Sequence, residues 1–141
     1  MALNGPIVII DDDDDDRHMI YELLDDLKVT NPVRYFEHGG AAMDYLQTTS
    51  ESPLLILCDV NMPVMTGLEL RDRIDQDPYL KQKSIPFIFL TTSDDLALIK
   101  KAYAATIQGY FKKCSDFDSA RSDLALMIAY WKRCLHPNHH K

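Results

Sequence analysis

The chain has 141 residues and a hydrophobic fraction of 46%, enough for one domain with a buried core, which excludes a generally disordered protein. Its net charge of -7 disfavours nucleic-acid binding, because phosphate contacts need a basic surface. No apolar run approaches the roughly 18 residues of a membrane span, so we expect no membrane contact. No signal peptide is evident, and the three cysteines are odd in number and lack metal-ligand spacing. We therefore expect a cytoplasmic protein.

Apolar runs alternate with helical patterns along the chain. The first run, 7–10, contains only β-branched residues, as in a strand covered on both faces. Six consecutive aspartates follow at 11–16, and behind them apolar residues recur at helical spacing up to Leu27. Further strands are predicted at 32–36, 53–59, 85–92 and 109–113. Further helices are predicted at 39–47, 66–77, 94–105 and 117–135, the last marked by apolar residues that include Leu135.

Regular alternation of this kind predicts a parallel sheet, since each parallel pair of strands needs a crossover. Five such units suit an α/β flavodoxin-like (βα)5 doubly wound sheet with strand order 2-1-3-4-5, in a single domain over residues 1–141. Ligands of such sheets bind beyond the carboxyl ends of the strands, where strands 1 and 3 separate. The residues at those ends are therefore the candidates for function.

Polar side chains stand at four of these strand ends: Asp11 and Asp12, Asp59, Thr91 and Thr92, and Lys113. Each alone is more simply a turn, cap or edge residue, but their joint position favours a site. Oxygen donors in three carboxylates suit Mg²⁺, and an aspartate can accept a phosphoryl group while a lysine and a hydroxyl hold its oxygens. Residues 13–16 are explained by helix capping and solvation.

These motifs resemble the response-regulator receiver domains of two-component signalling. The resemblance covers nearly the whole chain and rests on "VIIDD" (8–12), "LILCDVNMPVMTGLEL" (55–70), "FIFLTTS" (87–93) and "GYFKK" (109–113). The Asp-x-Asn-Met-Pro pattern followed by Thr-Gly is the most specific of them. "FLTTS" and "LMIAYWKR" further resemble single-domain receivers of the cyanobacterial-phytochrome-regulator type.

The resemblance implies a phosphoryl-transfer site with one bound metal ion. Asp59 would be the phosphoacceptor, and Lys113 would contact the phosphoryl group. Mg²⁺ would be bound by Asp59, by Asp12, by Asp11 directly or through water, and by the backbone carbonyl of Asn61.

The same resemblance implies a switch. Thr91 would be its hydroxyl, also in contact with the phosphoryl group, and Tyr110 the aromatic ring that changes rotamer with it. Asn61 and Ser93 would tune the attack of water on the acyl phosphate. Gly67 matches the glycine that follows the phosphorylation loop.

One position departs from the family pattern. The family usually has proline after the lysine, often through a cis bond, but Cys114 follows Lys113 here. A non-proline cis bond costs about 2.5–4 kcal/mol, so we predict a trans bond with Lys113 still in place.

The sequence thus predicts a stand-alone response regulator without an output domain, a switch rather than a turnover enzyme. Its phosphoryl donor would be a sensor histidine kinase or a histidine phosphotransfer protein. Its output would pass to a partner or a homodimer through residues 94–105, 109–113 and the last helix. A small Mg²⁺-dependent phosphohydrolase with an aspartyl-phosphate intermediate is an alternative, although it would want a carboxylate where Asn61 stands. A degenerate receiver that only binds partners is disfavoured because the strand-end residues are retained.

Overall fold

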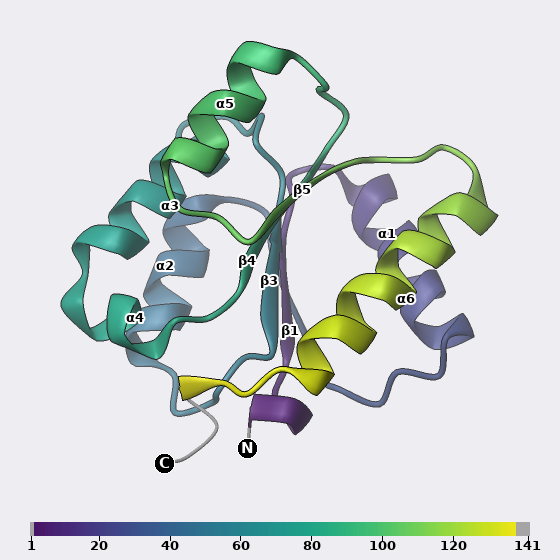
Figure 1. The fold of residues 1–141 in the computed structure, drawn as a ribbon, viewed down its shortest axis with the longest axis horizontal. Coiled ribbons are helices and arrows are strands. Elements are labelled where there is room, and N and C mark those ends of the chain that lie inside the picture. The colour runs from purple at the N-terminus through teal and green to yellow at the C-terminus, as the bar shows by residue number, and fades with distance from the viewer. Residues whose placement is uncertain (1, 138–141) are drawn as a thin grey trace.

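The computed structural model describes residues 2–137, and within them five parallel strands form one sheet in the order β2-β1-β3-β4-β5 (Figure 1). The strands are β1 (Ile7–Ile10), β2 (Val33–Phe36), β3 (Leu55–Cys58), β4 (Phe87–Thr91) and β5 (Gly109–Lys112). The predicted flavodoxin-like order is confirmed. Each strand after β1 is one to three residues shorter than predicted, so Asp59 lies just beyond β3 and Lys113 just beyond β5.

Helices cover both faces of the sheet. The α-helices are α1 (Asp14–Asp26), α2 (Gly39–Thr48), α3 (Gly67–Gln76), α4 (Pro78–Lys83), α5 (Leu96–Ala104) and α6 (Phe117–Arg133), and a 3-10 turn, η1, spans Ala2–Asn4. Figure 1 shows α2, α3, α4 and α5 on one side of the strands and α1 with α6 on the other. Within residues 2–137 no helix is both long and apolar enough to cross a membrane.

The core forms two layers because neighbouring strand residues point to opposite faces. Val8 and Ile10 of β1 pack toward α2 and α3, whereas Ile7 and Ile9 pack toward α1 and α6. All four side chains are at most 1% exposed. Burial of each contributes about 1.5–3 kcal/mol relative to exposure, so β1 is firmly fixed beneath the residues that follow it.

Two helix boundaries differ from the sequence prediction. The helical pattern stops before Pro78 as expected, but a further short helix, α4, begins there. Asp77 ends α3 and caps α4, and its carboxylate accepts hydrogen bonds from the backbone N–H groups of Tyr79 and Leu80. A new helix can begin at Pro78 because proline suits the first turn of a helix. The last helix ends at Arg133, and Leu135 lies beyond it and is 90% exposed.

Candidate functional site

Three carboxylates meet where the sequence predicted a site. Asp11 and Asp12 follow β1, and Asp59 follows β3, whose last residue pairs in register with the last residue of β1. One oxygen from each of the three carboxylates lies within 4.8 Å of the others. Asp11 and Asp59 are buried, and Asp12 is exposed. Burial raises the pKa of Asp11 above its ordinary value, although hydrogen bonds from Lys113 and the Asp13 backbone act against that rise.

Lys113 is the cation facing this cluster. Its Nζ lies 2.7 Å from Asp11 Oδ2, 2.6 Å from Asp16 Oδ2 and 3.3 Å from Asp59 Oδ2. Burial opposes the charge of Lys113, but its hydrogen bonds to Asp11 and Asp16 outweigh that effect and hold its pKa above the ordinary value. The amine therefore stays protonated at neutral pH and offers its three protons to three carboxylates.

The rest of the acidic run includes a helix cap, an ion pair and one contact that the sequence did not predict. Asp13 caps α1, accepting hydrogen bonds from the backbone N–H groups of Asp15 and Asp16 at 2.8 and 3.2 Å, and Asp14 pairs with Arg17. For Asp16 the prediction of a solvated cap was wrong, since its carboxylate binds Lys113. The signal was weak, because the face that the first turn of α1 presents depends on how the helix packs.

The predicted switch residues lie on the two strands beside the carboxylates. Thr91 ends β4 and is completely buried, and its Oγ1 has no hydrogen-bond partner within residues 2–137. The backbone N–H of Lys113 donates to the Thr91 carbonyl at 2.7 Å, which joins the threonine to the lysine. Tyr110 on β5 is half-buried, and its hydroxyl donates to the Ser93 carbonyl at 2.8 Å. Thr92 is exposed.

The loop after β3 brings its backbone close to Asp59. The N–H of Asn61 donates to Asp59 Oδ1 at 3.4 Å, while the Asn61 side chain is exposed. Gly67 begins α3 so near the loop that a Cβ there would overlap the Asp59 carbonyl and lie 2.7 Å from the Phe89 ring. The Gly67 N–H donates to Val60 O at 2.8 Å. Close packing at Gly67 thus holds the Asp59 backbone in place.

The two cysteines near the site have structural roles. The bond between Lys113 and Cys114 is trans, as predicted, and none of the peptide bonds in the described residues is cis. The Cys114 thiol lies 3.5 Å from Asp123 Oδ2 on α6. Cys58 is buried beside Asp59 and donates to its carbonyl at 3.1 Å, and burial raises the pKa of its thiol.

These residues fit a divalent cation. The carboxylates of Asp11, Asp12 and Asp59 supply only oxygen donors, as Mg²⁺ prefers, and they outnumber the single Lys113 charge. The hydroxyl of Thr91 is a buried donor without an acceptor in the described chain, which is expensive unless some state of the site supplies one. The edge therefore suits a metal ion together with an anionic group.

The chain is similar to known response regulators over most of its length. A family model of the response regulator receiver domain matches residues 7–125. Response regulator Rcp1 of Synechocystis is 31% identical over 118 residues, which cover 80% of this chain and 79% of Rcp1. The crystal structure of phosphorylated cyanobacterial phytochrome response regulator RcpA has a TM-score of 0.85 at 27% identity, covering 95% of this chain and 99% of RcpA. That of the Mn²⁺-bound form of Rcp1 has a TM-score of 0.80 at 26% identity, covering 93% and 96%.

Proposed function

Because this chain belongs to the response regulator receiver domain family, we propose that Asp59 accepts a phosphoryl group from a histidine of a sensor histidine kinase or of a histidine phosphotransfer protein. Receiver domains are signalling switches that take phosphoryl groups from histidine kinases. The observation that carries the proposal is the protonated amine of Lys113, 3.3 Å from Asp59, among carboxylates that suit a cation.

In the proposed transfer, a carboxylate oxygen of Asp59 attacks phosphorus, and the phosphorus–nitrogen bond of the phosphohistidine breaks. The histidine nitrogen leaves with the bonding electron pair, and an acyl phosphate forms on Asp59. Lys113 stabilises the charge that gathers on the phosphoryl oxygens, since its amine already lies beside the attacking carboxylate. Asp11, Asp12 and Asp59, with the backbone carbonyl of Asn61, would hold Mg²⁺, which when bound neutralises phosphoryl oxygens.

We further propose that Thr91 and Tyr110 convert phosphorylation into a change of surface. The Thr91 hydroxyl would donate to a phosphoryl oxygen, which gives this buried group the acceptor it lacks within residues 2–137. Its movement would free space for the Tyr110 ring, whose hydroxyl would leave the Ser93 carbonyl. Ser93 and the exposed Asn61 would set how readily water reaches the acyl phosphate.

The output of this switch would be association of two copies of the chain through α5, β5 and α6. Leu96 and Tyr103 on α5, and Leu126 and Tyr130 on α6, are large apolar side chains that are between 52% and 67% exposed. A switch needs different affinities of the two states for the partner. Hydrogen exchange over residues 94–130 should therefore differ between the phosphorylated and unphosphorylated protein, and identical exchange would contradict this output.

Intact mass after incubation with Mg²⁺ and acetyl phosphate tests the chemistry. The wild type should gain one phosphoryl group that hydroxylamine removes, and the gain should vanish when Mg²⁺ is chelated. Asp59→Asn should not gain it, whereas Asp44→Asn, at an exposed aspartate on α2, should react as the wild type does. Undiminished phosphorylation of Asp59→Asn would contradict the assignment.

A further inference from the structure

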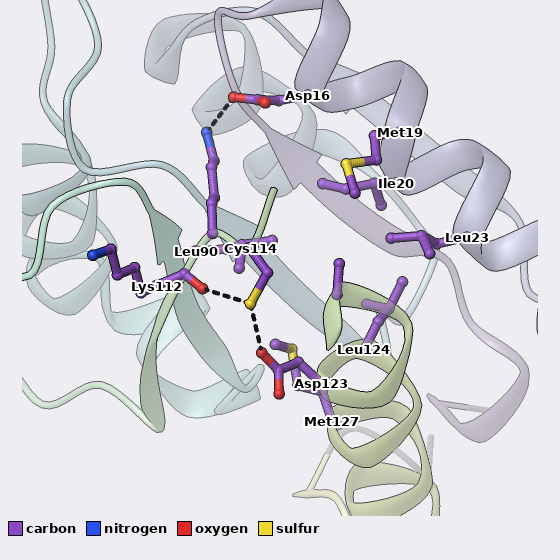
Figure 2. A pocket seen from close by; sticks show the side chains of 12 residues that line it. Asp16, Met19, Ile20, Leu23, Leu90, Lys112, Cys114, Asp123, Leu124 and Met127 are labelled. Atoms are coloured by element: carbon purple, nitrogen blue, oxygen red, sulfur yellow. Dashed lines mark hydrogen bonds and ion pairs between the residues drawn. The ribbon is translucent and has the colours of Figure 1, made fainter. Parts of the chain in front are cut away.

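The carboxylate of Asp16 is the feature that the proposed transfer leaves unexplained. It lies 2.6 Å from the amine of Lys113, nearer than Asp59 at 3.3 Å. Figure 2 shows Asp16 in the first turn of α1, joined by a dashed line to a lysine amine, with Met19 and Ile20 one turn further along the helix. The Asp16 side chain is 33% exposed, whereas those of Lys113 and Asp11 are 12% and 3% exposed.

The backbone of α1 fixes Asp16 in this position. Its N–H donates to the Asp13 carboxylate at 3.2 Å in the cap of the helix. One turn later, Ile20 is buried in the core between α1 and α6. The carboxylate therefore reaches Lys113 from a rigid turn, and the flexible lysine side chain is the partner that adapts.

We propose that Asp16 positions Lys113 and competes with the phosphoryl group for its amine, which lowers the occupancy of the phosphorylated state. This inference rests on the proposed function of Asp59. The three protons of the amine already face three carboxylates, and a phosphoryl group on Asp59 carries more negative charge than the carboxylate it replaces, so it competes with Asp11 and Asp16 for the amine.

Asp16 is the carboxylate whose displacement costs least. Asp11 is almost completely buried, so water could not replace the hydrogen bond that it would lose from the lysine. Asp59 itself carries the phosphoryl group. Asp16 is the most exposed of the three, so water can solvate its carboxylate after release. Its charge also repels the anionic phosphoryl donor.

Titration with beryllofluoride, a phosphoryl analogue, at saturating Mg²⁺ tests this competition. Asp16→Asn keeps the shape of the side chain and removes its charge, and we expect it to bind beryllofluoride about fivefold more tightly than the wild type, the size of a partly exposed ion pair. Asp15→Asn removes an exposed charge from the same helical turn and should bind within about twofold of the wild type. Asp16→Glu keeps the charge and should return most of the way to the wild-type value.

The ¹³Cε signal of Lys113 separates competition from a general structural effect. It should shift on beryllofluoride binding in the wild type, and in free Asp16→Asn it should already lie closer to the bound position. Equal affinities of the two asparagine variants, or weaker binding by Asp16→Asn, would overturn the inference while the wild type still bound beryllofluoride. Failure of the wild type to bind would overturn the proposed function and this inference with it.

Discussion

Replacing Gly67 by alanine should lower both stability and phosphorylation, because no space exists for a side chain there. The added Cβ would overlap the Asp59 carbonyl and lie 2.7 Å from Phe89 Cε1 and 3.0 Å from Val60 Cα. Carbon atoms pack at about 3.5–4.0 Å, so the ring contact alone requires a shift of about 0.8 Å. Two of the three opposing atoms belong to the backbone, which cannot rotate away.

Overpacking of this kind costs about 1–3 kcal/mol, and alanine regains about 0.5–1 kcal/mol over glycine in a helix. With the backbone clash at the upper end of that range, we expect Gly67→Ala to lose about 2 kcal/mol. This corresponds to a fall in Tm of roughly 5–8 °C for a domain of this size. The displaced carbonyl belongs to Asp59, and a misplacement near 1 Å can cost up to about 100-fold in rate, so phosphorylation by acetyl phosphate should slow roughly tenfold or more.

Thermal unfolding and timed intact-mass measurements check both effects. Gly40→Ala in α2 is the matched control, since the nearest atom to its new Cβ is His38 Nδ1 at 3.6 Å, an ordinary contact. It should be neutral or stabilising by up to about 1 kcal/mol and should be phosphorylated at the wild-type rate. If Gly67→Ala unfolded at the same temperature as Gly40→Ala, the account of the loop after β3 would be wrong.

Three further experiments probe the metal, the Thr91 hydroxyl and the loop that follows Lys113. Mg²⁺ at ten times its Kd should stabilise the wild type by about 1.4 kcal/mol in thermal unfolding. Asp12→Ala should abolish this stabilisation by Mg²⁺, and the control Asp15→Ala should keep it. Equal losses of stabilisation in the two variants would refute the ligand assignment. Thr91→Val should stabilise the unphosphorylated protein by about 1 kcal/mol in urea unfolding, because it removes a buried hydroxyl without a partner in the described chain. It should also reduce the change in hydrogen exchange that phosphorylation causes. A destabilised variant would show that the hydroxyl is already hydrogen-bonded. Cys114→Pro should change the loop after β5 while Asp59 remains phosphorylated by acetyl phosphate, and loss of phosphorylation would show that Lys113 depends on the present loop.

The strand ends could be predicted from the sequence because the side-chain pattern of a parallel sheet depends on few variables. Once 7–10 and 53–59 are recognised as buried strands, Asp11 and Asp59 must meet at the same edge, and they do. Helix orientation is set by packing, so the contact of Asp16 with Lys113 was not predictable from spacing. The short helix at Pro78 was missed for a different reason. A proline there ends one helical pattern and can begin another, and six residues are too few to show a periodicity.

The negative charges of the carboxylates at the ends of β1 and β3 exceed the positive charge that Lys113 supplies. Oxygens of Asp11 and Asp59 lie within 4.8 Å, where two full charges at an effective dielectric constant near 20 repel by about 3.5 kcal/mol. Lys113 offsets part of this repulsion, but it also serves Asp16, so one positive charge is divided among three carboxylates. A divalent cation would relieve the remainder. The proposed phosphorylation would add further negative charge at Asp59, so the same arithmetic predicts that a bound cation strengthens the hold on the phosphoryl group.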